Sequence, residues 1–571
     1  MSGSRWIFHL KKNIRKFPAV YYIVQRIRVA YQQFCIYFGL VNLLNNEFSD
    51  LSRAMHNGRL PVISAQAESN SARILFFSPR IWDTHVVWEV AIAQSLQLRG
   101  ATVRFATCGG DLPICELQWG ARLSPNGCFR CYNYVHDYTG LAGFSSISVR
   151  ERVDDAEIKQ VVETVRQMDF KSLRNFKWLD LALGQYALPP ARWVLRTGKL
   201  EKHPAAREVL QDFVESAIRL VSGLRRVLEE YRPDVLVLLN GMFMEERVAH
   251  ELANRLNIRV VLYEVGRQAD SVFFSHNIAA CRYDISQSWS SRQETLLSAG
   301  QKARLGQLLG DRSRGDGVVE QYWKETLSSK SVLQERLGLY DGRPLATLFT
   351  NVTWDTSVQE RDTVFVDLFD WLETSIQLFL QHPEWDLVIR VHPAETQLPE
   401  RQSADLVTEI IAESLGDLPS NVRVIPPDQP LNSYALMQLA TIGLVYASTI
   451  GLEMACAGVP VIVASDAHYA SKGFTFDIRQ REDYASLVAR LMSGDLPASS
   501  DERRELACRY AYHFFVRRTL PMEIMTYKNR YKDRLRLLYG SLDDLQPGNS
   551  HTMDVICRGV LDGSEFEIDP P

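Results

Sequence analysis

From Ala72 onward, short apolar runs alternate with longer segments in which apolar residues recur at helical spacing. Continuous apolar runs of this kind are typical of strands buried on both faces of a parallel sheet, and the intervening helices complete βαβ units. Residues 74–78, 86–98 and 102–106 are predicted to form the first strand, helix and strand. Further strands are predicted at 234–239, 260–263, 345–350, 387–391, 422–425, 442–446 and 459–463, with helices at 245–256 and 363–380.

The predicted strands fall into two groups, which indicates two α/β domains of Rossmann-like form. Residues 70–325 form the first domain, with a mostly helical insertion at about 151–230, and residues 335–500 form the second. Two such domains place a cleft between the carboxyl ends of their sheets, where ligands bind. The flanking segments are predicted to be a helical extension at 1–60, C-terminal helices at 501–545 and a flexible acidic tail at 546–571.

Composition and charge exclude several classes of protein. With 571 residues, of which 46% are apolar, the chain is large enough for two buried cores. A net charge of −4 gives no general attraction for nucleic acid, so we expect no nucleic-acid partner. No window approaches the ~18 uninterrupted apolar residues of a membrane-spanning helix. The basic start lacks the apolar core of a signal peptide, and we therefore expect a cytoplasmic protein.

Residues 1–50 combine basic and aromatic side chains, which suits an amphipathic helix lying on an anionic membrane surface. We therefore expect this segment to bind the inner membrane surface, which would make the protein peripheral at its cytoplasmic face. The alternative is a helix packed on the body of the protein or on a partner subunit. The residues concerned are Trp6, Phe8, Lys11, Lys12, Arg15, Lys16, Phe17, Tyr21, Tyr22, Arg26, Arg28, Tyr31, Phe34, Tyr37 and Phe38.

The stretch 446–465 has the pattern of a strand end, a polar turn, a short helix, a Gly-Pro turn and a second buried strand. Its turn residues Ser448, Thr449 and Gly451 are then expected at the N-terminus of the helix. Unpaired N–H groups and the helix dipole favour an anion at that position.

Upstream of this turn, a predicted strand runs into His392-Pro393. A histidine at the carboxyl end of a strand can donate a hydrogen bond to a phosphate oxygen, and Arg390 can add a bidentate contact if its side chain faces the cleft. A second pair, His382-Pro383, lies in a predicted helix-to-strand loop and is interpreted as a surface turn. Combined with Ser448-Thr449, His392 predicts a site for the phosphates of a nucleotide.

A strand followed by His-Pro, with a Ser-Ser or Ser-Thr pair at a later helix start, resembles bacterial capsule-polysaccharide glycosyltransferases. These include Kdo-transferase-like capsule proteins and bacterial sialyl- and polysialyltransferases, whose acidic motif has no clear match here. The resemblance covers about residues 340–480. It implies a GT-B fold, an α/β fold with two tandem Rossmann-like domains facing a cleft, and donor-binding roles for His392, Ser448 and Thr449 at the phosphate of a CMP-sugar. It also implies that catalysis requires no metal cofactor.

Glu453 lies early in the helix that follows Ser448 and Thr449. In many GT-B enzymes a glutamate of this helix accepts hydrogen bonds from the ribose hydroxyls, and a vicinal diol offers the two donors that a carboxylate can accept. The alternative is a first-turn glutamate that only interacts favourably with the helix dipole.

The first domain is expected to hold the acceptor and the catalytic base. A group must take the proton of the acceptor hydroxyl in an inverting transfer, and His85 or Asp83, in the loop after the first strand, could serve. The alternative for His85 is a histidine that only caps or packs a helix start. Asn240 and Glu264 follow two further strands and are candidates for acceptor binding, or else local turn residues.

Four of the nine cysteines, Cys108, Cys115, Cys128 and Cys131, fall within a short segment that ends in a Cys-x2-Cys pair. Four thiolates can hold structural zinc, although these gaps do not match a standard zinc ribbon. The alternative is a set of unligated or redox-active thiols.

The sequence therefore favours a glycosyltransferase that moves a sugar from a nucleotide-sugar donor to a surface polysaccharide or a lipid-linked acceptor. Two alternatives stay open. One is a CDP-alcohol phosphotransferase of the teichoic-acid type, and the other is a non-catalytic scaffold in a capsule-assembly complex.

Overall fold

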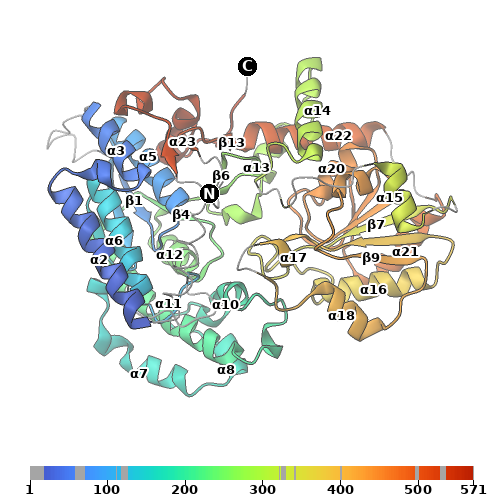
Figure 1. The fold of residues 1–571 in the computed structure, drawn as a ribbon, viewed down its shortest axis with the longest axis horizontal. Coiled ribbons are helices and arrows are strands. Elements are labelled where there is room, and N and C mark those ends of the chain that lie inside the picture. Colours follow the sequence, from blue (N-terminus) through green and yellow to red (C-terminus); the bar gives the residue numbers. More distant parts are fainter. Residues whose placement is uncertain are drawn as a thin grey trace.

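The computed structural model describes residues 18–57, 71–110, 112–117, 126–319, 322, 329–339, 342–398, 402–495, 501–526 and 535–569. Within these parts the chain forms two α/β domains that lie side by side, each built on one sheet (Figure 1). The predicted fold class, tandem Rossmann-like domains of the GT-B arrangement with helices at the N-terminus, is confirmed. The predictions for Lys11, Lys12, Arg15 and Lys16 lie outside the described residues.

The N-terminal domain contains a seven-stranded sheet in the order β13-β6-β5-β4-β1-β2-β3. Strands β1 to β5 are parallel, whereas β6 is antiparallel to both β5 and β13. The bounds are β1 (Arg73–Phe77), β2 (Thr102–Thr107), β3 (Ser146–Ser148), β4 (Val235–Leu239), β5 (Arg259–Val265), β6 (Ser271–His276) and β13 (Leu520–Pro521).

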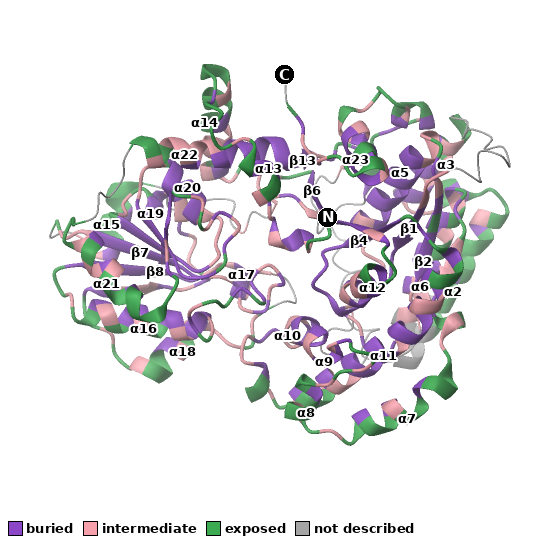
Figure 2. Ribbon diagram, turned by 180° about the vertical axis from the view of Figure 1, so that it is seen from behind, coloured by how far each residue is buried: buried purple, intermediate pink, exposed green. Residues whose placement is uncertain are grey.

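Helices cover both faces of this sheet, because alternate strand residues are apolar on both sides. Leu75 and Phe77 of β1 pack on one face, and Ile74 and Phe76 pack on the other. The strand β1 is accordingly buried along its length in Figure 2. The helices of this domain are α2 (Pro18–Tyr37), α3 (Asn46–Asn57), α5 (Asp83–Leu98), α6 (Asn126–Leu141), α7 (Asp155–Arg166), α8 (Phe170–Arg174), α9 (Leu183–Tyr186), α10 (Leu188–Leu195), α11 (Ala206–Tyr231), α12 (Met244–Arg255) and α13 (Ser286–Ser290). The next helix, α14 (Ala299–Arg314), packs against α22 (Asp501–Tyr512) of the C-terminal domain (Figure 1).

The C-terminal domain contains a six-stranded, fully parallel sheet in the order β12-β11-β10-β7-β8-β9. Its strands are β7 (Leu345–Phe349), β8 (Asp386–Arg390), β9 (Val422–Ile425), β10 (Ile442–Val445), β11 (Val461–Val463) and β12 (Phe476–Asp477). The helices are α15 (Lys330–Leu337), α16 (Leu368–Leu380), α17 (Ala394–Gln397), α18 (Val407–Leu415), α19 (Ser433–Met437), α20 (Ile450–Cys456), α21 (Arg481–Met492) and α22 (Asp501–Tyr512).

The C-terminal segment differs from its prediction. After α22 and a π-helical turn, β13 joins the N-terminal sheet, and two short strands follow, β14 (Met525–Thr526) and β15 (Arg536–Leu537), so the helices predicted over 501–545 occupy only part of that range. The tail predicted to be flexible contains α23 (His551–Asp562), which packs on the N-terminal core. Ser550 caps its start, Gly563 ends it in the left-handed conformation, and residues such as Met553 and Ile556 are buried.

Polar contacts join the two domains beneath the cleft. The Arg361 guanidinium donates to the carbonyl oxygen of Arg282 at 2.9 Å, and Arg192 donates to the Gln359 side chain at 2.6 Å.

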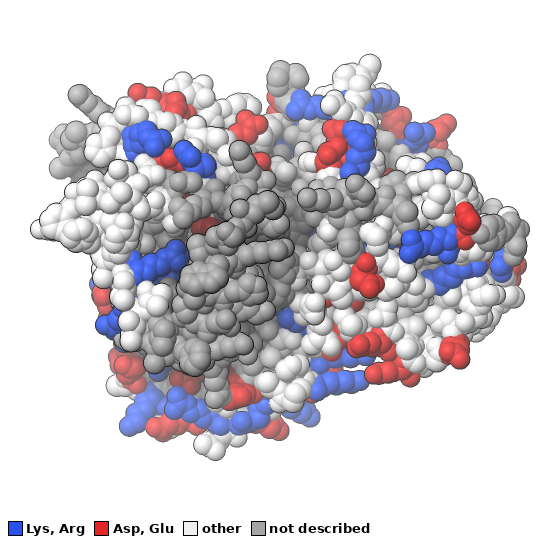
Figure 3. All heavy atoms as spheres, in the orientation of Figure 1, with Lys and Arg blue, Asp and Glu red and all other residues white. Residues whose placement is uncertain are grey.

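On the face of the molecule seen in Figure 3, acidic and basic side chains are intermixed over the described surface. No helix in the described part of the chain is both long enough and apolar enough to cross a membrane.

Candidate donor and acceptor pocket

A cavity of about 930 Å³ lies where the carboxyl ends of the two sheets meet. Loops after β1, β4 and β5 line it from the N-terminal domain, and loops after β7, β8 and β10 line it from the C-terminal domain. This is the position at which doubly wound sheets bind ligands, and the volume suits a small molecule. The predicted residues that line it are Asp83, His85, Asn240, Glu264, Arg390, His392, Ser448, Thr449 and Glu453.

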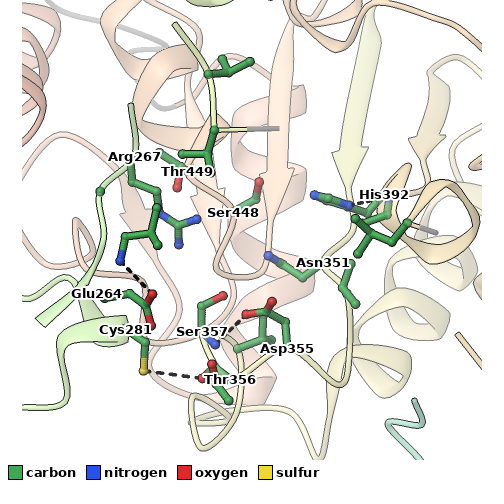
Figure 4. A pocket seen from close by; sticks show the side chains of 18 of the residues that line it. Glu264, Arg267, Cys281, Asn351, Asp355, Thr356, Ser357, His392, Ser448 and Thr449 are labelled. Atoms are coloured by element: carbon green, nitrogen blue, oxygen red, sulfur yellow. Dashed lines mark hydrogen bonds between the residues drawn. The ribbon is translucent and has the colours of Figure 1, made fainter. Parts of the chain in front are cut away.

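His392 follows β8 and is held as a neutral hydrogen-bond donor. Burial, and then the nearby positive charge of Arg390, lower its pKa to about 4. The backbone N–H of Ala394 donates to Nδ1 at 3.1 Å, so Nδ1 is unprotonated and Nε2 carries the proton. The imidazole extends into the cavity toward Ser448 (Figure 4). It can therefore donate to an anionic oxygen without first taking up a proton.

Ser448 and Thr449 lie in the turn between β10 and α20, and both are half-buried in the cavity wall. The Tyr469 hydroxyl donates to the carbonyl oxygen of Ser448 at 2.6 Å and so fixes the turn. A Cβ on Gly451 would lie 2.3 Å from the same hydroxyl. Gly451 is thus required for close packing beneath the turn and does not line the pocket, unlike its predicted role in donor binding. Because α20 has only seven residues, the hydroxyl groups are stronger candidates for anion contacts than its dipole.

Arg390 serves a different purpose from the one predicted. Its guanidinium is buried and donates to the carbonyl oxygens of Pro426 at 2.8 Å and Gln429 at 3.1 Å. These bonds hold the loop that leads into α19, next to the pocket. The predicted bidentate phosphate contact does not fit this geometry, because the planar donor edge already faces backbone carbonyls. Arg390 is better described as a positioning residue that also keeps the pKa of His392 low.

Arg267 is a pocket residue that strand-end reasoning did not assign to the phosphate side of the pocket. It lies just beyond β5, its guanidinium stacks over the Tyr283 ring at 4.2 Å, and it reaches into the cavity on the side of Ser448 and Thr449 (Figure 4). The Gly266-Arg267 pair after a buried strand was the available signal in the sequence. Arg267 brings positive charge from the N-terminal domain to the group of donors supplied by the C-terminal domain.

Glu453 faces the pocket from α20 and is buried against Arg312 of α14. The Arg312 Nε donates to Glu453 Oε1 at 2.6 Å, and the Tyr434 hydroxyl approaches the same oxygen at 3.4 Å. The ion pair offsets the cost of burying the carboxylate. A carboxylate has about four lone-pair sites, so this arrangement is compatible with the predicted bonds from a ribose diol.

Asn240 and Glu264 form a polar pair on the N-terminal wall. Asn240 Nδ2 donates to Glu264 Oε2 at 2.6 Å and to Thr356 Oγ1 at 3.1 Å, which links the two domains. The Val265 N–H donates to the other Glu264 oxygen at 2.8 Å, while burial raises the pKa of Glu264. The pair therefore places an oriented carboxyl group at the cavity, where it can accept a hydrogen bond from a sugar hydroxyl.

His85 and Asp83 lie at the start of α5, on the N-terminal wall. The half-buried His85 ring is surrounded by aromatic rings, with Trp82 and Tyr263 both 5.8 Å away between centroids. Asp83 is exposed and its carboxylate accepts from the Thr84 N–H at 2.8 Å. Both groups are thus within the cavity wall that faces the donors of the C-terminal domain.

Three of the four cysteines, Cys108, Cys115 and Cys131, lie near Arg80 beneath this wall. The Arg80 guanidinium is fully buried and pairs with Glu246 and with Glu116 at 3.2 Å, and both carboxylates lie within the N-terminal core. Cys108 donates to the carbonyl oxygen of Pro79 at 3.3 Å, and the Ile81 N–H donates to Cys131 at 3.0 Å.

Burial raises the pKa values of Cys108, Cys115 and Cys131, so these three thiols are protonated at neutral pH. In the part of the chain that the structure describes, no group of three or more His, Cys, Asp or Glu side chains is placed to hold a metal ion. The prediction that Cys108, Cys115, Cys128 and Cys131 hold zinc therefore finds no support among the described residues.

No protein-family model and no curated protein sequence matches this chain. Its fold is similar to that of KpsC from Thermosulfurimonas dismutans, a β-Kdo 2,4 transferase, at 14% identity and a TM-score of 0.32 over 55% of this chain and 86% of KpsC. The glycosyltransferase SnogD from Streptomyces nogalater matches at 16% identity and a TM-score of 0.26 over 80% of this chain and 98% of SnogD. A UDP-GlcNAc 2-epimerase from Neisseria meningitidis matches at 12% identity and a TM-score of 0.24 over 78% and 96%. Similarity this low assigns no activity to the chain.

Proposed function

We propose that this chain is a glycosyltransferase that takes a sugar from a nucleotide-sugar donor, with a CMP-sugar favoured, and transfers it to a surface or capsular glycan or a lipid-linked acceptor. The observation that carries the proposal is the convergence of His392, Ser448 and Thr449 with Arg267 in one cavity that also contains His85 and Asp83. His392, Ser448 and Thr449 come from the C-terminal domain, whereas Arg267 and the candidate bases come from the N-terminal domain, an arrangement that suits a transfer between two substrates.

The donor half acts on the leaving phosphate. As the bond between the anomeric carbon and the phosphate oxygen breaks, negative charge develops on that oxygen. The neutral His392 imidazole, the hydroxyls of Ser448 and Thr449 and the charge of Arg267 are fixed donors directed at such an anion, which lowers the barrier. The preference for CMP rests on the resemblance of the His-Pro and Ser-Thr motifs.

The acceptor half acts on the attacking hydroxyl. In an inverting transfer the acceptor oxygen bonds to the anomeric carbon, the nucleotide leaves with the bonding electron pair, and the hydroxyl proton passes to His85 or Asp83. Glu264, oriented by Asn240, is placed to accept a hydrogen bond from the acceptor or the transferred sugar. The chemistry is thereby divided between the two walls of the cavity.

A thermal-shift screen with CMP, CDP, UDP and GDP tests this proposal on the full-length protein. At least one nucleotide should raise the melting temperature, because a ligand at a hundredfold excess over its Kd stabilises the folded state by about 2.7 kcal/mol. CMP is expected to give the largest shift, whereas a larger shift with CDP than with CMP would favour the CDP-alcohol phosphotransferase, whose donor carries a diphosphate. If none of the four nucleotides changes the melting temperature, the chain does not bind such donors and the non-catalytic scaffold is favoured.

A further inference from the structure

One face of α2 is apolar, exposed and continuous. Ile23, Ile27, Tyr31, Phe34 and Phe38 recur at spacings of three and four residues, which places them on one side of the helix. Ile27 is 64% exposed and Phe38 is 59% exposed, and Phe34 and Phe38 pack together with ring centroids 4.6 Å apart. Of the 17 large apolar side chains that are exposed in the described residues, nine lie in α2 and the turn that follows it: Ile23, Val24, Ile27, Tyr31, Phe34, Tyr37, Phe38, Leu40 and Leu43.

The opposite face of α2 is fixed to the body of the N-terminal domain. Val29 and Cys35 are buried, and Gln32 and Gln33 donate to Asp137 at 2.7 Å and Asn133 at 3.0 Å on α6. The helix runs along the outer edge of the domain, away from the C-terminal domain (Figure 1). The exposed stripe is therefore a preformed surface on a docked helix. The packed face of α2 agrees with the sequence-based alternative of a helix packed on the body of the protein. The exposed face leaves the other alternative, a helix on a membrane surface, equally compatible with this arrangement.

The charge of this part of the chain matches an anionic surface. Residues 1–46 contain seven Lys and Arg and no Asp or Glu, whereas the whole chain has 64 basic and 68 acidic residues. The first 46 residues thus carry a charge of +7, and the remaining 525 carry 57 − 68 = −11. Two copies of such a segment would repel one another, so charge disfavours pairing of this face with a second copy. An anionic lipid surface attracts basic segments, at about 1 kcal/mol for each Lys or Arg near the headgroups.

We propose that the exposed face of α2, defined by Ile23, Ile27, Tyr31, Phe34 and Phe38, docks the protein flat on an anionic lipid bilayer. The apolar stripe enters the boundary between headgroups and acyl chains, and Arg28, exposed on the same helix, contacts the headgroups.

Docking through α2 also orients the pocket. The chain turns from α2 through Val41–Leu43 into α3, and Asn45 and Glu47 at that turn line the cavity together with Asp83 and His85. A path along the protein surface thus leads from the bilayer to the wall that holds the candidate bases. The claim that docking orients the pocket rests on the proposed function, and it predicts that the acceptor is presented at the membrane.

Co-sedimentation with vesicles of phosphatidylcholine and phosphatidylglycerol tests the docking face on the full chain. The wild type should bind these vesicles and bind pure phosphatidylcholine less. Replacing both Ile27 and Phe34 with Glu should lower the partition coefficient by more than about tenfold, since two apolar side chains become charged. The matched control replaces Leu296 and Val366, which are 66% and 80% exposed elsewhere, with Glu and should bind like the wild type.

Three results would overturn the proposal. The first is that I27E/F34E binds anionic vesicles as tightly as the wild type does. The second is that the wild type does not bind anionic vesicles. The third is that the wild type is a dimer in light scattering, which I27E/F34E converts to a monomer without a change in vesicle binding. Nucleotide-induced thermal shifts, measured on the same samples, keep the two proposals apart. Vesicle binding by a protein that responds to no nucleotide supports docking through α2 and contradicts the proposed transferase.

Discussion

Replacement of His392 with Ala should weaken nucleotide binding by roughly 10- to 100-fold, since a hydrogen bond to a charged group contributes about 1.5–3 kcal/mol. The imidazole loses its Nε2 proton donor, while Ser448, Thr449 and Arg267 remain in the cavity wall. The measurement is the nucleotide-induced rise in melting temperature, followed by calorimetric titration with the nucleotide that gives the largest shift.

The matched control is His382→Ala, because His382 is also followed by proline but pairs with Glu384 outside the pocket. It should bind nucleotide like the wild type. Equal affinities for the wild type and both variants would remove His392 from the donor site.

The lowered pKa of His392 gives a second readout of the same variant. In the unfolded chain this histidine has a pKa near its ordinary value of 6.5, whereas in the folded protein the pKa is about 4. The unfolded state therefore binds more protons in this window, and folding stability falls as the pH drops from 6.5 toward 4. His392→Ala should lose less stability than the wild type over this range.

Replacement of the catalytic base should abolish most turnover and leave donor binding intact. A positioned base contributes about 10²- to 10⁴-fold to the rate, so His85→Ala or Asp83→Asn is expected to lose that factor. The aromatic enclosure of His85 by Trp82 and Tyr263 fixes its ring at the cavity, which makes it the stronger of the two candidates. Release of free nucleotide from a sugar donor that carries the nucleotide found in the thermal-shift screen measures turnover.

His136→Ala is the control for this pair, since His136 is exposed on α6 and lies outside the pocket lining. It should retain wild-type turnover. Parallel thermal shifts distinguish a lost base from a lost donor site. If both His85→Ala and Asp83→Asn turn over at the wild-type rate, neither side chain is the base and the acceptor side of the account is wrong.

Much of the fold was predictable, because each buried parallel strand is a local apolar run. The runs at 422–425 and 442–446 correspond closely to β9 and β10. β6 was missed, although it forms a local hairpin with β5; its other edge pairs with β13, from more than 240 residues later in the chain. The acidic tail was predicted to be flexible because of its composition, but α23 is specified by Ser550, Gly563 and an apolar face that finds its partner only in the folded N-terminal domain.

The location of a site residue was predictable where the residue directly follows a strand or lies in a turn after one. His392, Ser448 and Thr449 follow strand ends, and the topology brings them to one cavity. The role of Arg390 was not predictable, because the loop that takes its hydrogen bonds is brought over it by tertiary folding. Likewise Arg267 and Arg312 enter the pocket from the other domain or from a distant helix, and local sequence does not specify such contacts.

We expect the cavity between the two sheets to bind the phosphate of a nucleotide. Calorimetric titration of the full-length protein with CMP and with cytidine isolates the contribution of that phosphate, because the two ligands share the base and the ribose. CMP should bind at least roughly tenfold more tightly, through the charge-assisted bonds of His392, Ser448, Thr449 and Arg267. Equal affinity for CMP and cytidine, or binding of neither, would contradict this expectation.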